Sequence, residues 1–252
     1  MHPNASLNDI VAYLDGLLEV EKYAAEPDSN GLLHRAGDGV SQIACAVNTS
    51  LTTIAGAAKG GAQLLIVHHT SWPGIDHHLR EEKFAALAAA GISLYGVHAA
   101  LDCAPRIGNG WVLAGLLGVE VEETFLEFSG GHAGVAGRCG GSFEELIRRT
   151  SERIGMQVEA HQHAKSFGRV AVVPGGGGET AYMDEARRLG CETYVTGEGS
   201  MYTRMFAKEC GMNLILGTHY ATEAPGIKSL GELVSDHARV PWTYIDESPD
   251  VF

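Results

Sequence analysis

Two widely separated segments of the sequence, residues 91–102 and 211–223, share one pattern. Each has a glycine that ends a helix, a short apolar strand, a histidine directly after the strand, and a carboxylate four residues later. A third apolar strand ends in two consecutive histidines. Imidazole and carboxylate groups are metal ligands, and the three segments together offer enough of them for two metal ions. The side chains are His68, His69, His98, Asp102, His219 and Glu223.

The type of ligand narrows the choice of metal. A single histidine with a nearby carboxylate is commonly just a hydrogen-bonded pair, but the repeat of the pattern favours metal binding because a metal ion needs three or four convergent ligands. Mixed imidazole and carboxylate ligands suit zinc, iron, manganese, cobalt or nickel. We expect Thr222 to cap a helix that has Pro225 in its first turn, which would hold Glu223 rigidly as a bridge between two cations.

Most other histidines lack such a pattern. His77 and His78 form a second tandem pair, but they stand in a polar helix start, so solvent-exposed cap residues are expected. The rest have no acidic or histidine partner at a useful spacing, except that two of them alternate along a strand. Surface positions are therefore expected for His34, His132, His161, His163 and His237.

Apolar strands and amphipathic helices alternate around the candidate ligands. After an N-terminal helix capped by Ser6, the first half has strands at 42–47, 64–67 and 94–97, with helices at 51–59 and ending near 90. The second half has strands at 170–173, 193–195 and 214–216, with helices at about 180–189 and ending near 210. Each half reads βαβαβ, which predicts a parallel sheet, and the likeness of the halves suggests a duplication.

The predicted fold is therefore α/β, with two similar lobes related by a pseudo-duplication. Each lobe has a mainly parallel or mixed sheet flanked by helices. Residues 1–123 form the N-terminal lobe and residues 124–252 the C-terminal lobe, with room for the final residues to pack back on the first. Residues 125–141 are rich in glycine, and Ser142 with Glu145 begins a helix through a capping box. Because functional residues lie beyond the carboxyl ends of parallel strands, the metal site is expected in a cleft between the lobes.

Composition excludes several classes of function. The chain has 252 residues, 45% of them hydrophobic, which is ample for a packed core. Its net charge of −13 argues against broad affinity for nucleic acid or anionic membranes. Five widely spaced cysteines suggest neither a disulfide framework nor a thiolate zinc site, so reduced and mostly buried thiols are expected. The N-terminus lacks signal-peptide features and no apolar run reaches membrane-spanning length, so we expect a cytoplasmic location.

A run of four glycines follows the predicted strand at 170–173. Gly176, Gly178 and Ala181 satisfy one form of the dinucleotide fingerprint, but consecutive glycines satisfy many spacings by accident, and no Walker A lysine follows. A tight turn and a loop that binds a substrate phosphate are the alternatives. Glu198 either contacts substrate or supports a metal ligand. The substrate-binding candidates are Gly176, Gly177, Gly178, Glu198 and Tyr220.

The order of these motifs resembles the Nif-three-like dinuclear-metal-centre family over nearly the whole chain. Many members of that family carry the name GTP cyclohydrolase type 2 homologue. The resemblance implies two α/β lobes, a two-metal site between them and a toroidal hexamer. The segments that carry it are 64–69, 97–102, 168–173, 196–198 and 217–223.

The resemblance also implies a ligand set. His68, Asp102 and Glu223 would hold one metal, while His69, His219 and Glu223 would hold the other, with His98 beside them. Two departures alter the wall of the pocket: Thr70 replaces the usual proline, and Ala99 with Ala100 replaces more polar residues. The domain inserted between the lobes of longer members is absent, so its role cannot be transferred.

Two divalent ions in a cleft commonly activate water, so we expect a hydrolase of a small nucleotide-like or cyclic-amide substrate. His98 is the candidate general acid or base, and Tyr220 is a weaker one. The alternative function is a non-catalytic scaffold that handles or senses metal ions, because the same ligands serve both roles. A nucleic-acid partner is disfavoured by the acidic charge.

Overall fold

The computed structural model describes residues 4–26 and 28–248, which divide into two compact units. Unit 1 contains the described residues of 1–101 and 227–252, and unit 2 contains residues 102–226. The sequence placed the boundary after residue 123. That position lies inside β7 (Val119–Phe128), which pairs with β8 (Gly131–Cys139) on both sides of it. The division falls instead at the end of the short helix α5 (His98–Asp102), because a strand cannot be cut without breaking its ladder.

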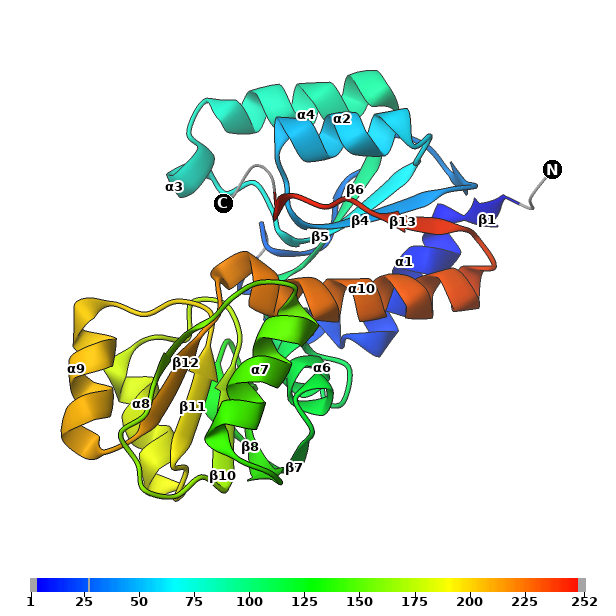
Figure 1. The fold of residues 1–252 in the computed structure, drawn as a ribbon. Helices are drawn as coiled ribbons and strands as arrows, with labels where there is room; N and C mark the ends of the chain where they lie inside the picture. Colours follow the sequence, from blue (N-terminus) through cyan, green and yellow to red (C-terminus); the bar gives the residue numbers. More distant parts are fainter. Residues whose placement is uncertain (1–3, 27, 249–252) are drawn as a thin grey trace. The chain divides into compact units, whose positions relative to one another are not determined.

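Unit 1 contains a five-stranded sheet whose three central strands are parallel (Figure 1). The C-terminal strand joins one edge in parallel, and an N-terminal strand joins the other in antiparallel orientation. In spatial order the strands are β13 (Trp242–Tyr244), β4 (Ile43–Asn48), β5 (Leu64–His69), β6 (Ser93–Val97) and β2 (Asn30–His34). Two of the central strands lead to candidate ligands: β5 ends in His68 and His69, and His98 follows β6 directly. A separate two-stranded sheet is formed by β1 (Ala5–Ser6) and β3 (Gly39–Val40).

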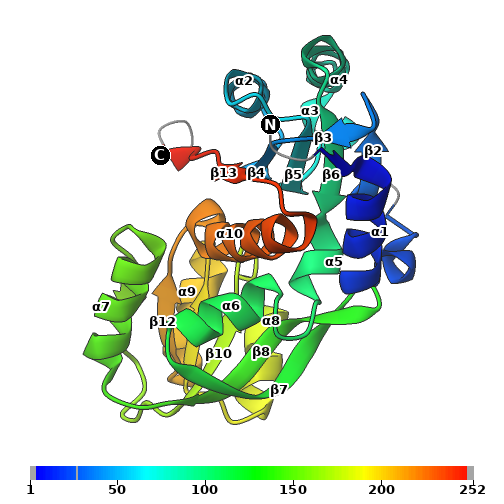
Figure 2. The same ribbon diagram turned by 90° about the vertical axis from the view of Figure 1, so that its right-hand side faces the viewer.

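Helices cover both faces of the unit 1 sheet (Figures 1 and 2). One face packs against α2 (Leu51–Lys59) and α4 (Leu79–Ala90) through a cluster of small and aliphatic side chains that includes Ile54 and Leu87. The other face is covered by α1 (Leu7–Leu17) and by the second half of α10 (His219–Ala238), which begins in unit 2. Two shorter helices, η1 (Val20–Tyr23) and α3 (Pro73–Asp76), lie in the connections.

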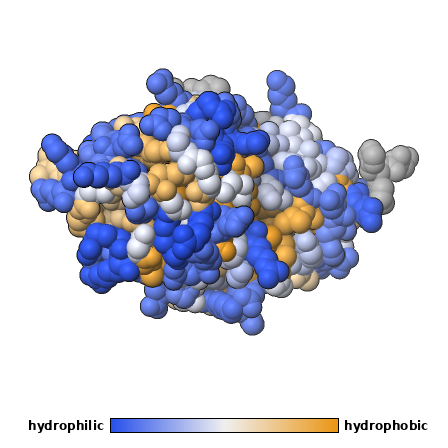
Figure 3. All heavy atoms as spheres, turned by 60° about the horizontal axis from the view of Figure 1, so that its bottom comes forward, coloured by the Kyte–Doolittle hydropathy of each residue, from blue (hydrophilic) through white to orange (hydrophobic). Residues whose placement is uncertain are grey.

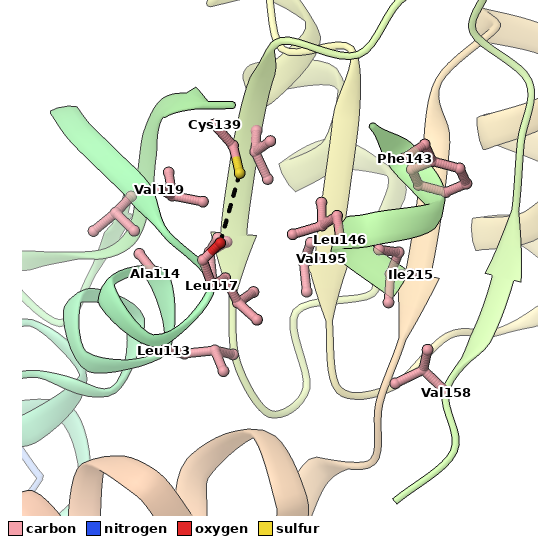
Figure 4. Close-up of a cluster of buried hydrophobic side chains, with 13 residues drawn as sticks. Leu113, Ala114, Leu117, Val119, Cys139, Phe143, Leu146, Val158, Val195 and Ile215 are labelled. Carbon is pink, nitrogen blue, oxygen red and sulfur yellow. Dashed lines mark hydrogen bonds between the residues drawn. The ribbon is translucent and has the colours of Figure 1, made fainter. Parts of the chain in front are cut away.

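Unit 2 contains a six-stranded mixed sheet whose parallel centre is flanked by antiparallel strands. In spatial order the strands are β7, β8, β10 (Arg169–Val173), β11 (Thr193–Thr196), β12 (Asn213–Leu216) and β9 (Glu159–His161). One face packs on α6 (Asn109–Leu116) and α7 (Phe143–Ile154), and Figure 4 shows the buried side chains of this layer. The other face packs on α8 (Thr180–Arg188) and α9 (Met201–Cys210).

The predicted α/β class, with sheets flanked by helices, is confirmed. Gly91 and Gly211 end α4 and α9 in the left-handed conformation, with φ of 66° and 65°, as the repeated pattern predicted. The capping box of Ser142 and Glu145 is also present. The hairpin of β7 and β8 and the helix α6 were not predicted. The proposed duplication of the two halves stays a prediction.

The start of α10 differs from its prediction. The helix begins at His219, where the Thr218 hydroxyl accepts a hydrogen bond from the Ala221 backbone N–H at 3.2 Å. Thr222, predicted as the cap, is inside the helix and donates its hydroxyl to the Thr218 carbonyl at 2.8 Å. Pro225 therefore lies within the helix rather than in its first turn. Glu223 therefore does not lie at the helix N-terminus, where the helix dipole was expected to favour its carboxylate.

The surface mixes hydrophilic and apolar side chains on the face shown in Figure 3. Four of the five cysteines are buried and Cys210 is exposed, so the thiols are mostly buried, as predicted. None of the helices in the described part of the chain is long and apolar enough to cross a lipid bilayer.

Candidate metal centre

The tandem histidines end β5 at the carboxyl edge of the unit 1 sheet. His68 is fully buried, and its Nδ1 lies 3.1 Å from the Val97 carbonyl oxygen. His69 is half-buried, and its Nδ1 lies 2.7 Å from Oδ1 of Asn48. A carbonyl oxygen only accepts, so Nδ1 donates in both cases and Nε2 is the nitrogen at which a metal ion can bind. The second partner, Asn48, ends β4 directly opposite His69 in the ladder.

His98 joins these two imidazoles. It follows β6 directly as the first residue of α5. Its ring centroid lies 5.1 Å from that of His68 and 5.8 Å from that of His69. One nitrogen from each of the three rings lies within 4.8 Å of the other two, which is close enough for a common metal ion. The cluster forms because carboxyl ends of neighbouring parallel strands share one sheet edge, as the sequence predicted.

Two residues that the sequence did not single out complete the surroundings of His98. Oε2 of Glu26 lies 3.5 Å from His98 Nδ1, and both side chains are about a quarter exposed. The Trp72 ring packs edge-on against His98 at 5.1 Å and near His69 at 5.7 Å, and its indole N–H donates to the Ser29 hydroxyl at 2.9 Å. Trp72 is thus an aromatic wall beside two candidate ligands.

Unit 2 carries a second group of candidate ligands on α10. His219 and Glu223 are one helical turn apart, and His219 Nε2 lies 3.1 Å from Oε1 of Glu223, which is 3% exposed. The backbone of Gly175 approaches this pair closely: a Cβ there would lie 2.0 Å from Glu223 Oε1 and 3.0 Å from His219 Nε2. Only glycine leaves room for the carboxylate in this position.

Glu198 lies beside His219. Its Oε1 is 3.0 Å from His219 Nδ1, so both ring nitrogens of His219 face carboxylates. Burial disfavours the charged imidazole, but the two carboxylates outweigh burial and raise the pKa of His219 to about 9. In the absence of metal the ring is therefore protonated at neutral pH. This position of Glu198 supports its role as a partner of a ligand, one of the two roles considered from the sequence.

Asp102 is half-buried at the end of α5. Its Oδ1 accepts a hydrogen bond from the Asn109 side-chain N–H at 2.8 Å. Asn109 is 1% exposed in the first turn of α6, so it holds one carboxylate oxygen in a fixed direction. Asn109 and Asn48 were both missed in the sequence. An asparagine that ends a strand next to a histidine-bearing strand was the available signal for Asn48.

The glycine run divides into two kinds of position. The backbone around Gly177 and Gly178 is packed, since a Cβ would lie 2.4 Å from Val173 Cγ1 at the first and 2.2 Å from the Glu198 carbonyl oxygen at the second. Gly176 is exposed, and its nearest atom to a Cβ is His219 Cε1 at 3.5 Å. Positions 177 and 178 thus fit the tight-turn interpretation. Within the run, Gly176 is the position open to solvent.

The other predicted residues take varied positions. Tyr220 is only 8% exposed, which leaves little of it available to a substrate. His77, His78, His132 and His237 are exposed, as predicted. His34, His161 and His163 are half-buried instead. His161 has an acidic partner two residues away, since its Nε2 lies 2.6 Å from Oε1 of Glu159.

Comparison with known proteins supports the family resemblance. The family model described as Duf34/NIF3 (NGG1p interacting factor 3) matches residues 5–250. A protein of Pyrococcus horikoshii named GTP cyclohydrolase 1 type 2 homolog is 33% identical over 250 residues, covering 95% of this chain and 97% of the relative. A Deinococcus radiodurans protein of the same name is 29% identical over 254 residues, covering 95% and 92%.

Solved structures show the same fold. The protein ybgI, described as of unknown function, has a TM-score of 0.85 and 28% identity, covering 96% of this chain and 98% of the other. TTHA1606 from Thermus thermophilus has a TM-score of 0.80 and 27% identity, with the same coverage. The match of the family model to residues 5–250, nearly the whole length, shows that the chain belongs to the DUF34/NIF3 family.

Proposed function

We propose that this protein binds two divalent transition-metal ions and uses them to hydrolyse a small nucleotide-like or cyclic-amide substrate. The observation that carries the proposal is the cluster of His68, His69 and His98: one nitrogen of each ring lies within 4.8 Å of the other two, so the proposed proton-transfer group His98 stands beside two proposed ligands. Nδ1 of His68 and of His69 donates a hydrogen bond to a carbonyl oxygen, which fixes each ring and leaves Nε2 as the nitrogen that would bind a metal ion. Such fixed imidazoles are typical of metal sites rather than of solvated surface histidines.

The proposed ligand set follows the family resemblance. His68 and Asp102 would hold one ion, His69 and His219 would hold the other, and Glu223 would be a ligand of both. Each group fits this role by itself: Asp102 is fixed by Asn109, and Glu223 is almost fully buried beside His219. The Glu223 carboxylate is buried and faces the protonated imidazole of His219, so its surroundings already accommodate a positive charge.

Divalent ions in these positions supply Lewis-acid chemistry, activating water and neutralising negative charge that develops on the substrate. The chain's own contribution to proton transfer is assigned to His98. Its Nδ1 faces Glu26, which can stabilise a proton on that nitrogen while Nε2 exchanges a proton with the substrate. Trp72 packs beside this ring and limits its rotation.

The remaining proposals, on substrate, assembly and location, follow from the same resemblance. Gly176 offers the exposed backbone of the glycine run to a substrate phosphate, whereas Glu198 supports His219. The protein is proposed to form a closed homo-oligomer, a hexamer, in the cytoplasm. Its acidic charge is compatible with that location.

The test is a screen of metal-reconstituted protein against nucleotides and cyclic amides, with His69→Ala and His219→Ala as matched variants. Turnover that requires both histidines and added metal would support the hydrolase. Turnover in a metal-free His69→Ala protein would reject it. Firm metal binding with no turnover on any substrate would favour the alternative function, a scaffold that handles or senses metal ions.

A further inference from the structure

The segment that follows β13 places a buried carboxylate against the end of β4. Strand β13 pairs with residues 43–45 of β4 and then leaves the sheet. Glu247, 3% exposed, continues the pairing with its side chain: its Oε2 accepts hydrogen bonds from the backbone N–H groups of Val47 at 2.8 Å and Asn48 at 3.0 Å. A side chain thus replaces the carbonyl groups that a longer strand would have supplied.

Glu247 also reaches the start of the next helix. Its Oε1 accepts the Thr53 hydroxyl at 3.2 Å, and the Thr53 hydroxyl in turn lies 2.7 Å from that of Ser50, the N-cap of α2. The carboxylate therefore joins the end of β4 to the beginning of α2. Burial raises the pKa of Glu247, while the hydrogen bonds from Asn48, Val47 and Thr53 favour its charged form.

Glu247 fixes the backbone of Asn48, and the side chain of Asn48 orients the candidate ligand His69. Asn48 uses its backbone N–H for Glu247 and its side-chain carbonyl for His69 Nδ1. On the other side, the Thr49 backbone N–H and hydroxyl both donate to the His69 carbonyl oxygen, at 2.9 and 3.1 Å. His69 is held through both its backbone and its ring by consecutive residues at the end of β4.

We infer that Glu247 is a positioning residue for the metal centre, acting through Asn48 on the direction and tautomer of His69. This inference rests on the proposed function, since it assumes that His69 binds a metal ion. The mechanism is geometric. When the backbone of Asn48 is fixed, its Oδ1 stays within hydrogen-bond distance of His69 Nδ1, and Nε2 remains the available ligand nitrogen.

The experiment is a double-mutant cycle of Glu247→Ala and Asn48→Ala, read by titration of the metal-free protein with Co²⁺. Each single variant is expected to weaken Co²⁺ binding by roughly 10-fold or more, the usual cost of losing a partner of a metal ligand. If Glu247 acts through Asn48, the double variant should lose little more than Asn48→Ala alone. Ser248→Ala is the matched control, because this hydroxyl donates to the neighbouring Asp246 at 3.0 Å and not to β4, so binding should not change.

A second measurement separates positioning from loss of fold. In ¹⁵N spectra of the metal-free protein, His69 should carry its proton on Nδ1, and both single variants should shift it toward the other tautomer. Glu247→Gln keeps a side-chain oxygen that can accept from both backbone N–H groups, so it should restore Co²⁺ affinity toward the wild-type value. Wild-type Co²⁺ affinity in Glu247→Ala, or effects that multiply in the double variant, would overturn the inference. Absence of Co²⁺ binding to the wild type would instead reject the proposed metal centre.

Discussion

Replacing Gly175 by alanine should weaken metal binding much more than it destabilises the fold. The φ of Gly175 is +66°, and an added Cβ would lie 2.0 Å from Glu223 Oε1 and 3.0 Å from Glu223 Cδ. Carbon and oxygen atoms not bonded to each other normally approach to about 3.5 Å. In Gly175→Ala the carboxylate must therefore retreat by more than about 1 Å, whereas metal–ligand distances tolerate about 0.2 Å. We expect the variant to lose Glu223 as a ligand.

The effect on stability should be smaller. Glu223 Oε1 is the far end of a side chain, so it can move away without rearrangement of the backbone. The remaining costs are the left-handed conformation of an alanine, roughly 1–2 kcal/mol, and the weakened pairing of Glu223 with His219. For a protein of this size the conformational cost alone lowers the melting temperature by roughly 2–8 °C. Metal affinity, by contrast, should fall by at least the roughly 10–100-fold that a lost partner of a ligand costs.

Gly176→Ala is the matched control for this experiment. Its φ lies outside the left-handed region, and an added Cβ has no neighbour closer than His219 Cε1 at 3.5 Å. Co²⁺ titration and thermal unfolding of the metal-free proteins measure the two effects. Gly177 is unsuitable as a control because its Cβ would meet Val173 Cγ1 at 2.4 Å. Wild-type Co²⁺ affinity in a folded Gly175→Ala protein would refute the assignment of Glu223.

Three further predictions follow from the proposed ligands and from the charge on His219. Glu223→Ala should deplete both ions in elemental analysis, since it removes a ligand that they share; wild-type metal content would contradict the bridging role. The pKa of His219, about 9, exceeds the ordinary value of 6.5, so its pairing stabilises the metal-free fold fully below about pH 6.5. That stabilisation should disappear as pH rises through about 9, and His219→Gln should flatten this part of a melting-temperature profile; an unchanged profile would count against the pairing. Light scattering should report a closed oligomer, and a monomer at micromolar concentration would exclude the hexamer.

The sequence was most informative where local chemistry determines structure. Gly91 and Gly211 marked helix ends because an L-residue with a side chain rarely adopts positive φ. Short apolar runs after them predicted β6 and β12, and the histidines that follow therefore fell at strand ends. The grouping of His68, His69 and His98 was thus predictable from two neighbouring strands and one rule about parallel sheets.

The rest depended on contacts that no local pattern records. The partners of the ligands come from distant parts of the chain: Glu26 precedes β2, Asn48 ends a different strand, and Glu247 lies beyond β13. Pro225 misled the prediction of α10, because a proline that usually occupies a first turn lies here within the helix. The alternation in Val119–Phe128 was masked by the glycines that follow it, so the hairpin was missed.

The candidate ligands on the two units differ in how they are prepared for a cation. The imidazoles of His68 and His69 donate their Nδ1–H to carbonyl oxygens, so the groups that orient these two rings carry no charge. His219 lies between Glu198 and Glu223 and carries a proton at neutral pH. This proton supplies the positive charge that a metal ion would otherwise bring to the two carboxylates. Binding of an ion at His219 must therefore release that proton, and its affinity should rise roughly tenfold per pH unit up to about 9. His219 is not a proposed ligand of the ion assigned to His68 and Asp102, so that ion can bind without release of the His219 proton. The affinities of the two ions should therefore depend differently on pH.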